Sequence, residues 1–459
     1  MSSLFYMSGS RAEPFASAAA YNREVQIRLE LTPDALSAKV RRLFEASAAK
    51  IQSLEKSWAP SQGSPVFTVG GRYTSRGWTE WTQGFQFGSP ILQFDATGER
   101  AFLNLGRERT VAFMAPHVSH TGVHDHGFNN LSTYGNLLRL MDEGRIPEDA
   151  WERRFYELAL KLSGAVQAAR WSRTADGGGY IYSFNGPHSL FVDTIRSLRI
   201  LAVAHRLGHA LMGENDRRIS LLDRLMDHAR ATAKYAVYYG EGRDAYDVRG
   251  RVAHESIFNV NDGNYRCPNS QQGYSPFSTW TRGLAWAMCG FAEQLEFFET
   301  VPDQAPFVEV LEKAARATCD FYIENTPVDG IPYWDTGAPA LFELGDWRAR
   351  RSDPFNGHEP IDSSAAAIAA QGLLRLGNRL KEERYWRAGL TVCDSLFDEP
   401  YLSTDAAHQG LILHSVYHRP NGWDGGPGES SMWGDYHARE VALYVLRVIE
   451  GKRYLKFWV

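Results

Sequence analysis

The sequence predicts an all-α protein in which helices pair and close into a ring. Apolar residues recur at helical rather than alternating spacing along most of the 459-residue chain. This spacing marks about twelve helices, and neither an internal repeat nor a low-complexity linker separates them. An even set of long helices in one chain of this length favours helix pairs arranged as a single ring.

Several of the expected helices have recognisable starts. Pro33 and Pro147 stand beside acidic residues in first turns, where a missing N–H costs nothing and negative charge suits the helix dipole. Asp362 precedes two serines and an Ala-rich run, which predicts an N-cap. The expected helices cover residues 34–56, 79–97, 99–116, 126–142, 147–169, 190–211, 215–237, 278–298, 304–325, 361–377, 383–399 and 433–450.

Little strand is expected, apart from short hairpins near 179–183 and 244–254. Four long connections are rich in Gly, Pro, Asn, Asp and Trp, and loops of that length are usually functional. We expect them to gather at one rim of the ring and to wall a pocket there. They cover about 171–189, 238–277, 326–360 and 400–432. We divide the chain into an N-terminal extension, 1–30, and one helical domain, 31–459.

The composition narrows the class of protein. Apolar residues make up 44% of the chain, enough for a large core, and the net charge is −5 without a basic run, which argues against a nucleic-acid partner. Aromatic residues, at 13%, suit sugar binding as well as a large helical core, and both explanations stay open. We find neither a signal peptide nor an apolar run long enough for a membrane span, and expect a cytoplasmic protein acting on small imported sugars.

Two acidic residues stand at predicted helix starts. Asp125 lies in the segment His124-Asp125-His126-Gly127-Phe128, and Asp193 follows Phe191-Val192. Each could simply cap its helix. A pair of such acids, one protonated and one ionised, is also what general acid/base chemistry on a sugar requires. Two histidines without a third ligand nearby make a poor metal site, so we expect no metal.

A third segment, Gln272 to Trp286, carries two indoles and a guanidinium into a predicted helix. Arginine is almost never buried unpaired. Trp280, Arg282 and Trp286 therefore suit a binding surface for a sugar that bears a carboxylate. The alternative is a helix that packs its tryptophans and extends its arginine to solvent.

Seven segments, in order and spread over about residues 75–450, resemble motifs of glycoside hydrolase family 88, the unsaturated glucuronyl hydrolases. These segments are Glu80-Trp81-Thr82-Gln83-Gly84-Phe85, His124 to Phe128, Val192-Asp193-Thr194, Gln272-Gly273-Tyr274-Ser275, Ser278 to Gly283, Asp362 to Ala366, and Trp433-Gly434-Asp435-Tyr436. The resemblance implies an (α/α)6 barrel, which agrees with the expected helices.

The resemblance also implies a reaction. Such enzymes act on oligosaccharides whose non-reducing uronate carries a C4=C5 double bond, and they need neither metal nor organic cofactor. Asp193 would protonate C4 and then activate water, which predicts a raised pKa for Asp193 in an apolar pocket. Asp125 would be the second essential acid. The implied substrate-binding residues are Trp81, His124, His254, Gln272, Trp280, Arg282 and Trp286.

Three features depart from the motifs. His126 stands where an apolar residue is usual, and Leu284 where glutamine is usual. The loop 425–431 contains Glu429 and no cation, which disfavours a sulfated substrate unless an arginine from elsewhere lies nearby.

Three alternatives stay open beside the unsaturated glucuronyl hydrolase. An unsaturated rhamnogalacturonyl hydrolase of family 105 would share the fold and reaction but release rhamnose. A sugar epimerase would rely on histidines, and a non-catalytic toroid would bind glycans without needing Asp193. We expect a monomer or a homodimer.

Overall fold

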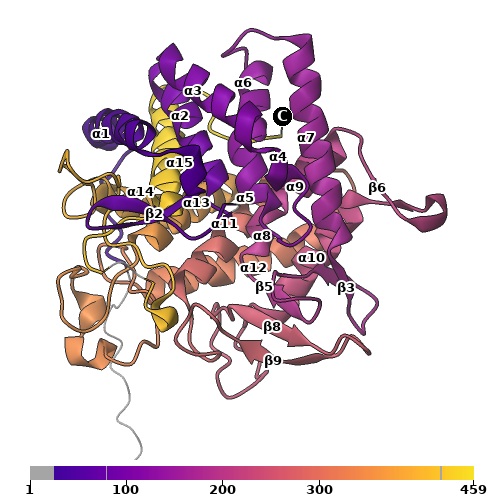
Figure 1. The fold of residues 1–459 in the computed structure, drawn as a ribbon. Coiled ribbons are helices and arrows are strands. Elements are labelled where there is room, and N and C mark those ends of the chain that lie inside the picture. The colour runs from indigo at the N-terminus through magenta and orange to yellow at the C-terminus, as the bar shows by residue number, and fades with distance from the viewer. Residues whose placement is uncertain (1–24, 79, 424–425, 459) are drawn as a thin grey trace, which may run out of the picture.

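Helices alternate between an outer and an inner layer in the computed structural model, which describes residues 25–78, 80–423 and 426–458 (Figure 1). The outer helices bury one face, and the inner helices are buried on nearly all sides. The outer layer comprises α1 (Ser37–Ser57), α3 (Arg100–Phe113), α7 (Ala150–Ala169), α10 (Leu221–Tyr235), α12 (Ala305–Glu324) and α14 (Glu383–Leu396).

The inner layer fills the centre of the ring. It comprises α2 (Gln83–Thr97), α5 (His126–Asn130) continuing through a π-helical turn (Leu131–Gly135) into α6 (Asn136–Asp142), α8 (Thr194–Ser197) with α9 (Arg199–Arg206), α11 (Thr281–Phe298), α13 (Ser363–Leu380) and α15 (Met432–Ile449). The last inner helix, α15, packs against α13 and also against α1 and α2 at the other end of the chain. The predicted ring is therefore confirmed.

Short elements complete the fold. A short helix, α4 (Ala115–Val118), precedes α5. Single 3₁₀ turns lie at Asp34–Leu36, Pro60–Gln62, Glu214–Asp216, Leu341–Leu344, Trp347–Ala349 and Arg419–Asn421. The strands, all in antiparallel pairs, are β1 (Pro65–Val69) with β2 (Arg72–Ser75), β3 (Trp171–Arg173) with β4 (Gly179–Ile181), β6 (Leu211–Met212) with β7 (Arg218–Ile219), and a sheet of β5 (Ser189–Phe191), β8 (Glu255–Phe258) and β9 (Tyr265–Asn269).

Several predicted boundaries are wrong because strand pairing displaces them. The helix expected over 190–211 starts only at Thr194, since β5 pairs with β8. The hairpin expected over 244–254 is instead formed by β8 and β9, and the earlier segment contributes only a bridge between Val237 and Val252. The hairpin expected near 179–183 is confirmed by β4. The β1–β2 hairpin was not predicted.

The described part of the expected N-terminal extension, residues 25–30, contacts the helical domain. Residues 1–24 of the expected extension are outside the described residues. The N–H groups of Val25 and Gln26 donate to the carbonyls of Ile323 and Val328, 2.8 and 2.9 Å away, so the chain is already tied to α12 and its following loop at this point. Within the described ranges, no helix is both long enough and apolar enough to cross a membrane.

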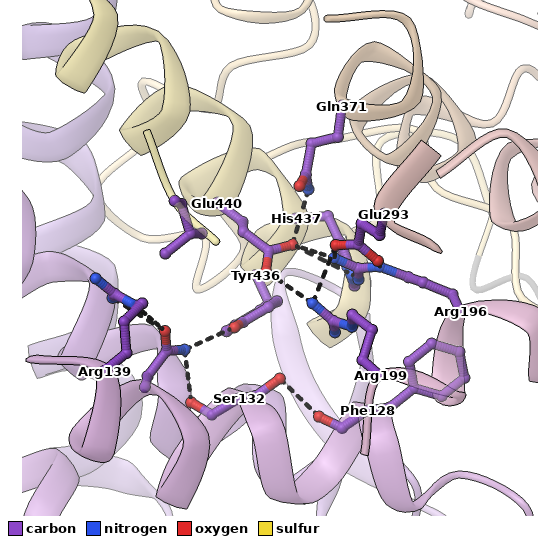
Figure 2. Close-up of polar contacts among 12 residues, drawn as sticks. Phe128, Ser132, Arg139, Arg196, Arg199, Glu293, Gln371, Tyr436, His437 and Glu440 are labelled. Carbon is purple, nitrogen blue, oxygen red and sulfur yellow. Dashed lines mark hydrogen bonds and ion pairs between the residues drawn. The ribbon is translucent and has the colours of Figure 1, made fainter. Parts of the chain in front are cut away.

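Charged side chains are buried at the centre of the ring (Figure 2). Arg196 of α8 donates to Glu293 of α11 at 3.2 Å and to Glu440 of α15 at 2.8 Å. Arg199 donates to the same Glu293 at 3.2 Å, and Gln371 of α13 donates to Glu440 at 2.8 Å. Burial raises the pKa of Glu440, but Arg196 and Arg199 outweigh burial and hold that pKa well below its ordinary value.

We expect Glu440→Gln to lower the free energy of unfolding by about 3 kcal/mol or more, because it leaves two buried guanidinium groups with one carboxylate. Urea denaturation followed by tryptophan fluorescence measures this. The matched control is Glu383→Gln in the solvent-exposed i,i+4 pair with Arg387, which should change stability by less than about 1 kcal/mol. Equal effects of the two variants would contradict the assignment.

Candidate active site

A pocket of about 430 Å³ opens where the inner helices α2, α5, α8 and α11 begin. Three of the four long connections contribute to its wall, as predicted. The fourth, 326–360, lines a neighbouring pocket of about 210 Å³ instead. The residues around the larger pocket are Glu80, Trp81, Val123, His124, Asp125, Phe128, Phe184, Phe191, Asp193, Gln271, Gln272, Trp280, Arg282, Trp286, Tyr417, His418, Asn421 and Trp423.

The two predicted acids meet because α5 and α8 approach each other closely. The N–H of Gly127 donates to the Ser197 hydroxyl at 3.0 Å, and that hydroxyl donates to the His124 carbonyl at 2.7 Å. A Cβ at residue 127 would lie 2.0 Å from the Ser197 carbonyl oxygen. Only glycine permits this contact, so Gly127 lets the segment with Asp125 approach the segment with Asp193.

Neither acid performs the capping role that was its alternative. Asp125 and Asp193 occupy the N-cap positions of α5 and α8, yet neither side chain accepts a capping hydrogen bond. Both residues are only 8% exposed and line the pocket. Two buried carboxyl groups that do not serve the backbone are available for chemistry.

His124 bridges the two acids. Its Nε2 lies 3.1 Å from Asp193 Oδ1 and 3.8 Å from Asp125 Oδ1. Burial lowers the pKa of His124, but both carboxylates oppose burial, and the net pKa is raised. The raised pKa favours the protonated imidazole of His124 between the two carboxylates.

The predicted raised pKa of Asp193 is wrong for this state of the protein. Burial does raise it, but the ion pair and hydrogen bond with His124, together with His254 and Arg282, bring the pKa of Asp193 below its ordinary value. The pKa of Asp125 is the one that is raised, because burial and the charge of Asp193 outweigh His124. The two environments therefore shift the pKa values of Asp125 and Asp193 in opposite directions. The acid with the raised pKa is Asp125, whereas the sequence predicted Asp193.

Arg282 is buried beneath the pocket and fully engaged. Its Nη1 donates to Asp362 at 3.0 Å and to the Val416 carbonyl, and its Nη2 donates to Gln272 Oε1 at 2.5 Å and to the Tyr417 carbonyl at 2.7 Å. Its guanidinium also stacks over Trp280, 4.5 Å from the ring centroid. All four terminal N–H groups of Arg282 thus donate to other groups of the protein. Arg282 would therefore act on a ligand in the pocket mainly through its positive charge.

His254 lies behind the wall. It does not line the pocket, but its ring lies 4.5 Å from that of Trp280. Its Nδ1 accepts the N–H groups of Gln271 and Gln272 at 3.0 and 3.3 Å, which places the proton of the neutral ring on Nε2. Burial lowers the pKa of His254 to about 3 and keeps it neutral.

Three buried nitrogens around the pocket have no partner among the described residues. They are His124 Nδ1, His254 Nε2 and Trp280 Nε1. These three nitrogens are available to form hydrogen bonds with a ligand in the pocket. No three acidic, histidine or cysteine side chains of the described part of the chain are placed to hold a metal ion.

Aromatic rings form the rest of the wall. Trp81 stacks on Trp433 with centroids 5.1 Å apart, and Trp286 packs against Phe128 at 4.8 Å. Trp280 and Trp286 are 3% and 1% exposed, so they form the floor rather than a surface platform. The combination of flat apolar faces with buried polar edges is typical of a sugar site.

Two of the three departures from the motifs, His126 and Leu284, lie outside the pocket. His126 points toward α7, where Nδ1 contacts the Ser163 hydroxyl at 2.9 Å and Nε2 donates to the His120 carbonyl at 3.0 Å. Burial lowers the pKa of His126 to about 4, so it is a neutral structural residue. Leu284 is 1% exposed within the core.

Several residues that line the pocket were given no role from the sequence, namely Glu80, Phe184, Phe191, Tyr417, His418, Asn421 and Trp423. Glu80 is the first residue of the motif over 80–85, which could have drawn attention to it. The lining residues between 417 and 423 belong to a loop that contains no motif and no periodic pattern. Only the length and composition of this loop predicted that it would contribute to the pocket.

The chain is similar to proteins named unsaturated glucuronyl hydrolase. It is 26% identical over 367 residues to the one from Formosa agariphila, covering 79% of each chain. It is 28% identical over 390 residues to the one from Bacillus sp. strain GL1, covering 82% of this chain and 89% of that one.

A solved structure shows the fold. The crystal structure of an unsaturated glucuronyl hydrolase from Streptococcus agalactiae superposes with a TM-score of 0.71 at 21% identity, over 96% of this chain and 98% of that one. No family model matches the sequence. The resemblance stated from the motifs is therefore confirmed by these relatives, as is the (α/α)6 barrel.

Asp362 holds the buried guanidinium of Arg282 and also caps α13 through Ser364 N–H. We expect Asp362→Asn to lower the free energy of unfolding by about 3 kcal/mol, because asparagine still caps but does not neutralise Arg282. The control is Asp149→Asn at the exposed N-cap of α7, with an expected change below about 0.5 kcal/mol. Thermal and urea unfolding compare the two, and a small effect at both sites would show that the buried pair is dispensable.

Proposed function

We propose that this chain, a relative of the unsaturated glucuronyl hydrolases, is a glycoside hydrolase that removes a C4=C5 unsaturated uronate from the non-reducing end of oligosaccharides. The observation that carries the proposal is the pair of buried aspartates joined through His124 in an aromatic pocket. The unpaired polar edges of His254 and Trp280 beside this pair support a polar ring as ligand.

In the proposed reaction an acid delivers a proton to C4 of the vinyl ether. Positive charge then develops at C5 and the ring oxygen. Water adds at C5 and loses its proton to the conjugate base of the same acid. The hemiketal that results opens at its C5–O5 bond, which leaves a ketone at C5 and a hemiacetal at C1. The hemiacetal then breaks its C1–O bond to the next sugar, so C1 becomes an aldehyde and the next sugar leaves with the proton as a free hydroxyl. Every proton consumed in the first step is returned in the second, so no cofactor is required.

We assign the acid to Asp193 working with His124. The proton that Asp193 delivers is held by the pair, because His124 Nε2 lies within hydrogen-bonding distance of Asp193 Oδ1. Proton transfer from the imidazolium to Asp193 places the proton on the carboxyl as the substrate approaches. Asp125, with its raised pKa, would donate a hydrogen bond to a sugar hydroxyl.

The uronate carboxylate would lie over the engaged guanidinium of Arg282. Since Gln272 Oε1 already accepts from Arg282, the Gln272 amide is oriented with its NH₂ group free to donate toward the pocket. Gln272, rather than Arg282 itself, then supplies the hydrogen bond, while Arg282 supplies the charge.

The main test is loss of ultraviolet absorbance from a panel of lyase-generated unsaturated disaccharides. We expect the wild type to bleach at least one of them and Asp193→Asn to be slower by about a thousandfold. Asp149→Asn, which lies outside the pocket, serves as control. Release of rhamnose would instead indicate the family 105 reaction. No bleaching by folded wild type, with sugar binding by calorimetry, would indicate a binding toroid and refute the hydrolase.

The pair of Asp193 and His124 predicts a pH dependence. The pKa of His124 is raised above its ordinary value of 6.5. His124 therefore keeps its proton until the pH rises above that value, and kcat/KM should fall only when this proton is lost. In His124→Gln the carboxyl alone must hold the proton, and we expect the alkaline limb to move about one pH unit or more toward acid. His209→Gln, outside the pocket, should leave the profile as it is. An unmoved alkaline limb in His124→Gln would exclude the shared proton.

A further inference from the structure

The pocket has a clear direction from floor to mouth. Trp280 and Trp286 at the floor are almost fully buried, whereas Phe184 and Trp423 are 56% and 36% exposed. Asp125 and Asp193 lie on the buried side. If the proposed function holds, on which this inference rests, the terminal uronate occupies the floor and the leaving sugar lies at the mouth.

An aromatic path leads to that mouth. Trp81 lies 6.5 Å from Tyr417, and Tyr417 lies 6.1 Å from Trp423, centroid to centroid. Trp423 also contacts His418 at 5.4 Å. Trp423 therefore stands at the mouth of the pocket, on a loop that the motifs do not cover.

A cation from a distant part of the chain lies on Trp423. The guanidinium of Arg76, just after β2, is 4.5 Å from the Trp423 ring centroid and 5.0 Å from that of Phe67. Arg76 is solvent-exposed, and among the described residues it has no salt-bridge or hydrogen-bond partner, although its charge lowers the pKa of the nearby Glu80. A guanidinium stacked in this way is held in place while the N–H groups at its edge remain available.

We propose that Arg76 and Trp423 form the binding site of the leaving sugar and select a sugar that carries an anionic substituent, a sulfate or a carboxylate. The indole offers the sugar ring a flat face, and the guanidinium edge offers the anion paired N–H donors. The cation that the loop 425–431 lacks is thus supplied by the β1–β2 hairpin.

Two nearby acids fit this assignment. Glu429 of the same loop is turned away from the pocket, since its carboxylate accepts the Thr68 hydroxyl at 2.5 Å and the Gly70 N–H at 2.7 Å. Glu80 does line the pocket and would repel an anion. Glu80 and Arg76 should therefore act on the same preference with opposite sign.

The experiment compares unsaturated disaccharides that share the uronate and differ only in the leaving sugar. One carries an unsubstituted N-acetylhexosamine, one its 6-sulfate and one a second uronate. The readout is the ratio of kcat/KM on each anionic substrate to that on the neutral one. We expect Arg76→Gln to lower this ratio about fivefold and Glu80→Gln to raise it, as befits a charge pair in partly exposed surroundings. Added salt should lower the ratio for wild type.

Arg72→Gln is the matched control, since Arg72 is exposed on β2 of the same hairpin, and neither arginine lines the pocket directly, but only Arg76 stacks on the pocket residue Trp423. It should keep the wild-type ratio. A fall with the sulfated substrate alone assigns sulfate, and a fall with the uronate alone assigns carboxylate. If wild type bleaches the substrates and Arg76→Gln leaves both ratios unchanged, this inference is refuted while the hydrolase stands. If wild type bleaches none, the proposed function fails and takes this inference with it.

Discussion

The charge network at the centre of the ring is the constraint on which the rest of the structure depends. Arg196 and Arg199 lie on one pair of inner helices, and Glu293 and Glu440 on two others (Figure 2). Ions so deeply buried are tolerable only when each finds its partners at hydrogen-bonding distance. The inner helices must therefore meet at one particular depth and rotation, whereas apolar side chains alone would tolerate small shifts.

The position of Asp193, the proposed acid, follows from that network. Asp193 precedes α8 by one residue, and Arg196 lies on the same short helix. Trp286 connects the charge network to the pocket, because the Arg196 guanidinium lies 5.7 Å from its ring and the indole also lines the pocket. This aromatic residue thus couples the geometry of the pocket to the packing of the barrel.

The protonation of the site is decided by neighbours and not by burial alone. Asp125 and Asp193 are equally buried, yet the pKa of the first is raised and that of the second is lowered. Asp193 lies within hydrogen-bonding distance of His124, at 3.1 Å against 3.8 Å for Asp125, and His254 and Arg282 also lower its pKa, whereas the charge of Asp193 raises the pKa of Asp125. Unequal charged neighbours thus shift the two pKa values in opposite directions, which is how one pocket can hold both a charged and a neutral carboxyl.

Much of this protein follows from its sequence alone. Helical spacing and capping residues such as Asp362 predict most of the helices, because these signals act within one or two turns. Ordered motifs identify Asp125, Asp193, Trp280 and Arg282. What the sequence could not determine depends on residues far apart in the chain. The partners of Arg282, the bridge made by His124 and the meeting of Arg76 with Trp423 arise only when the ring closes, because pairing, charge and exposure depend on distance in space.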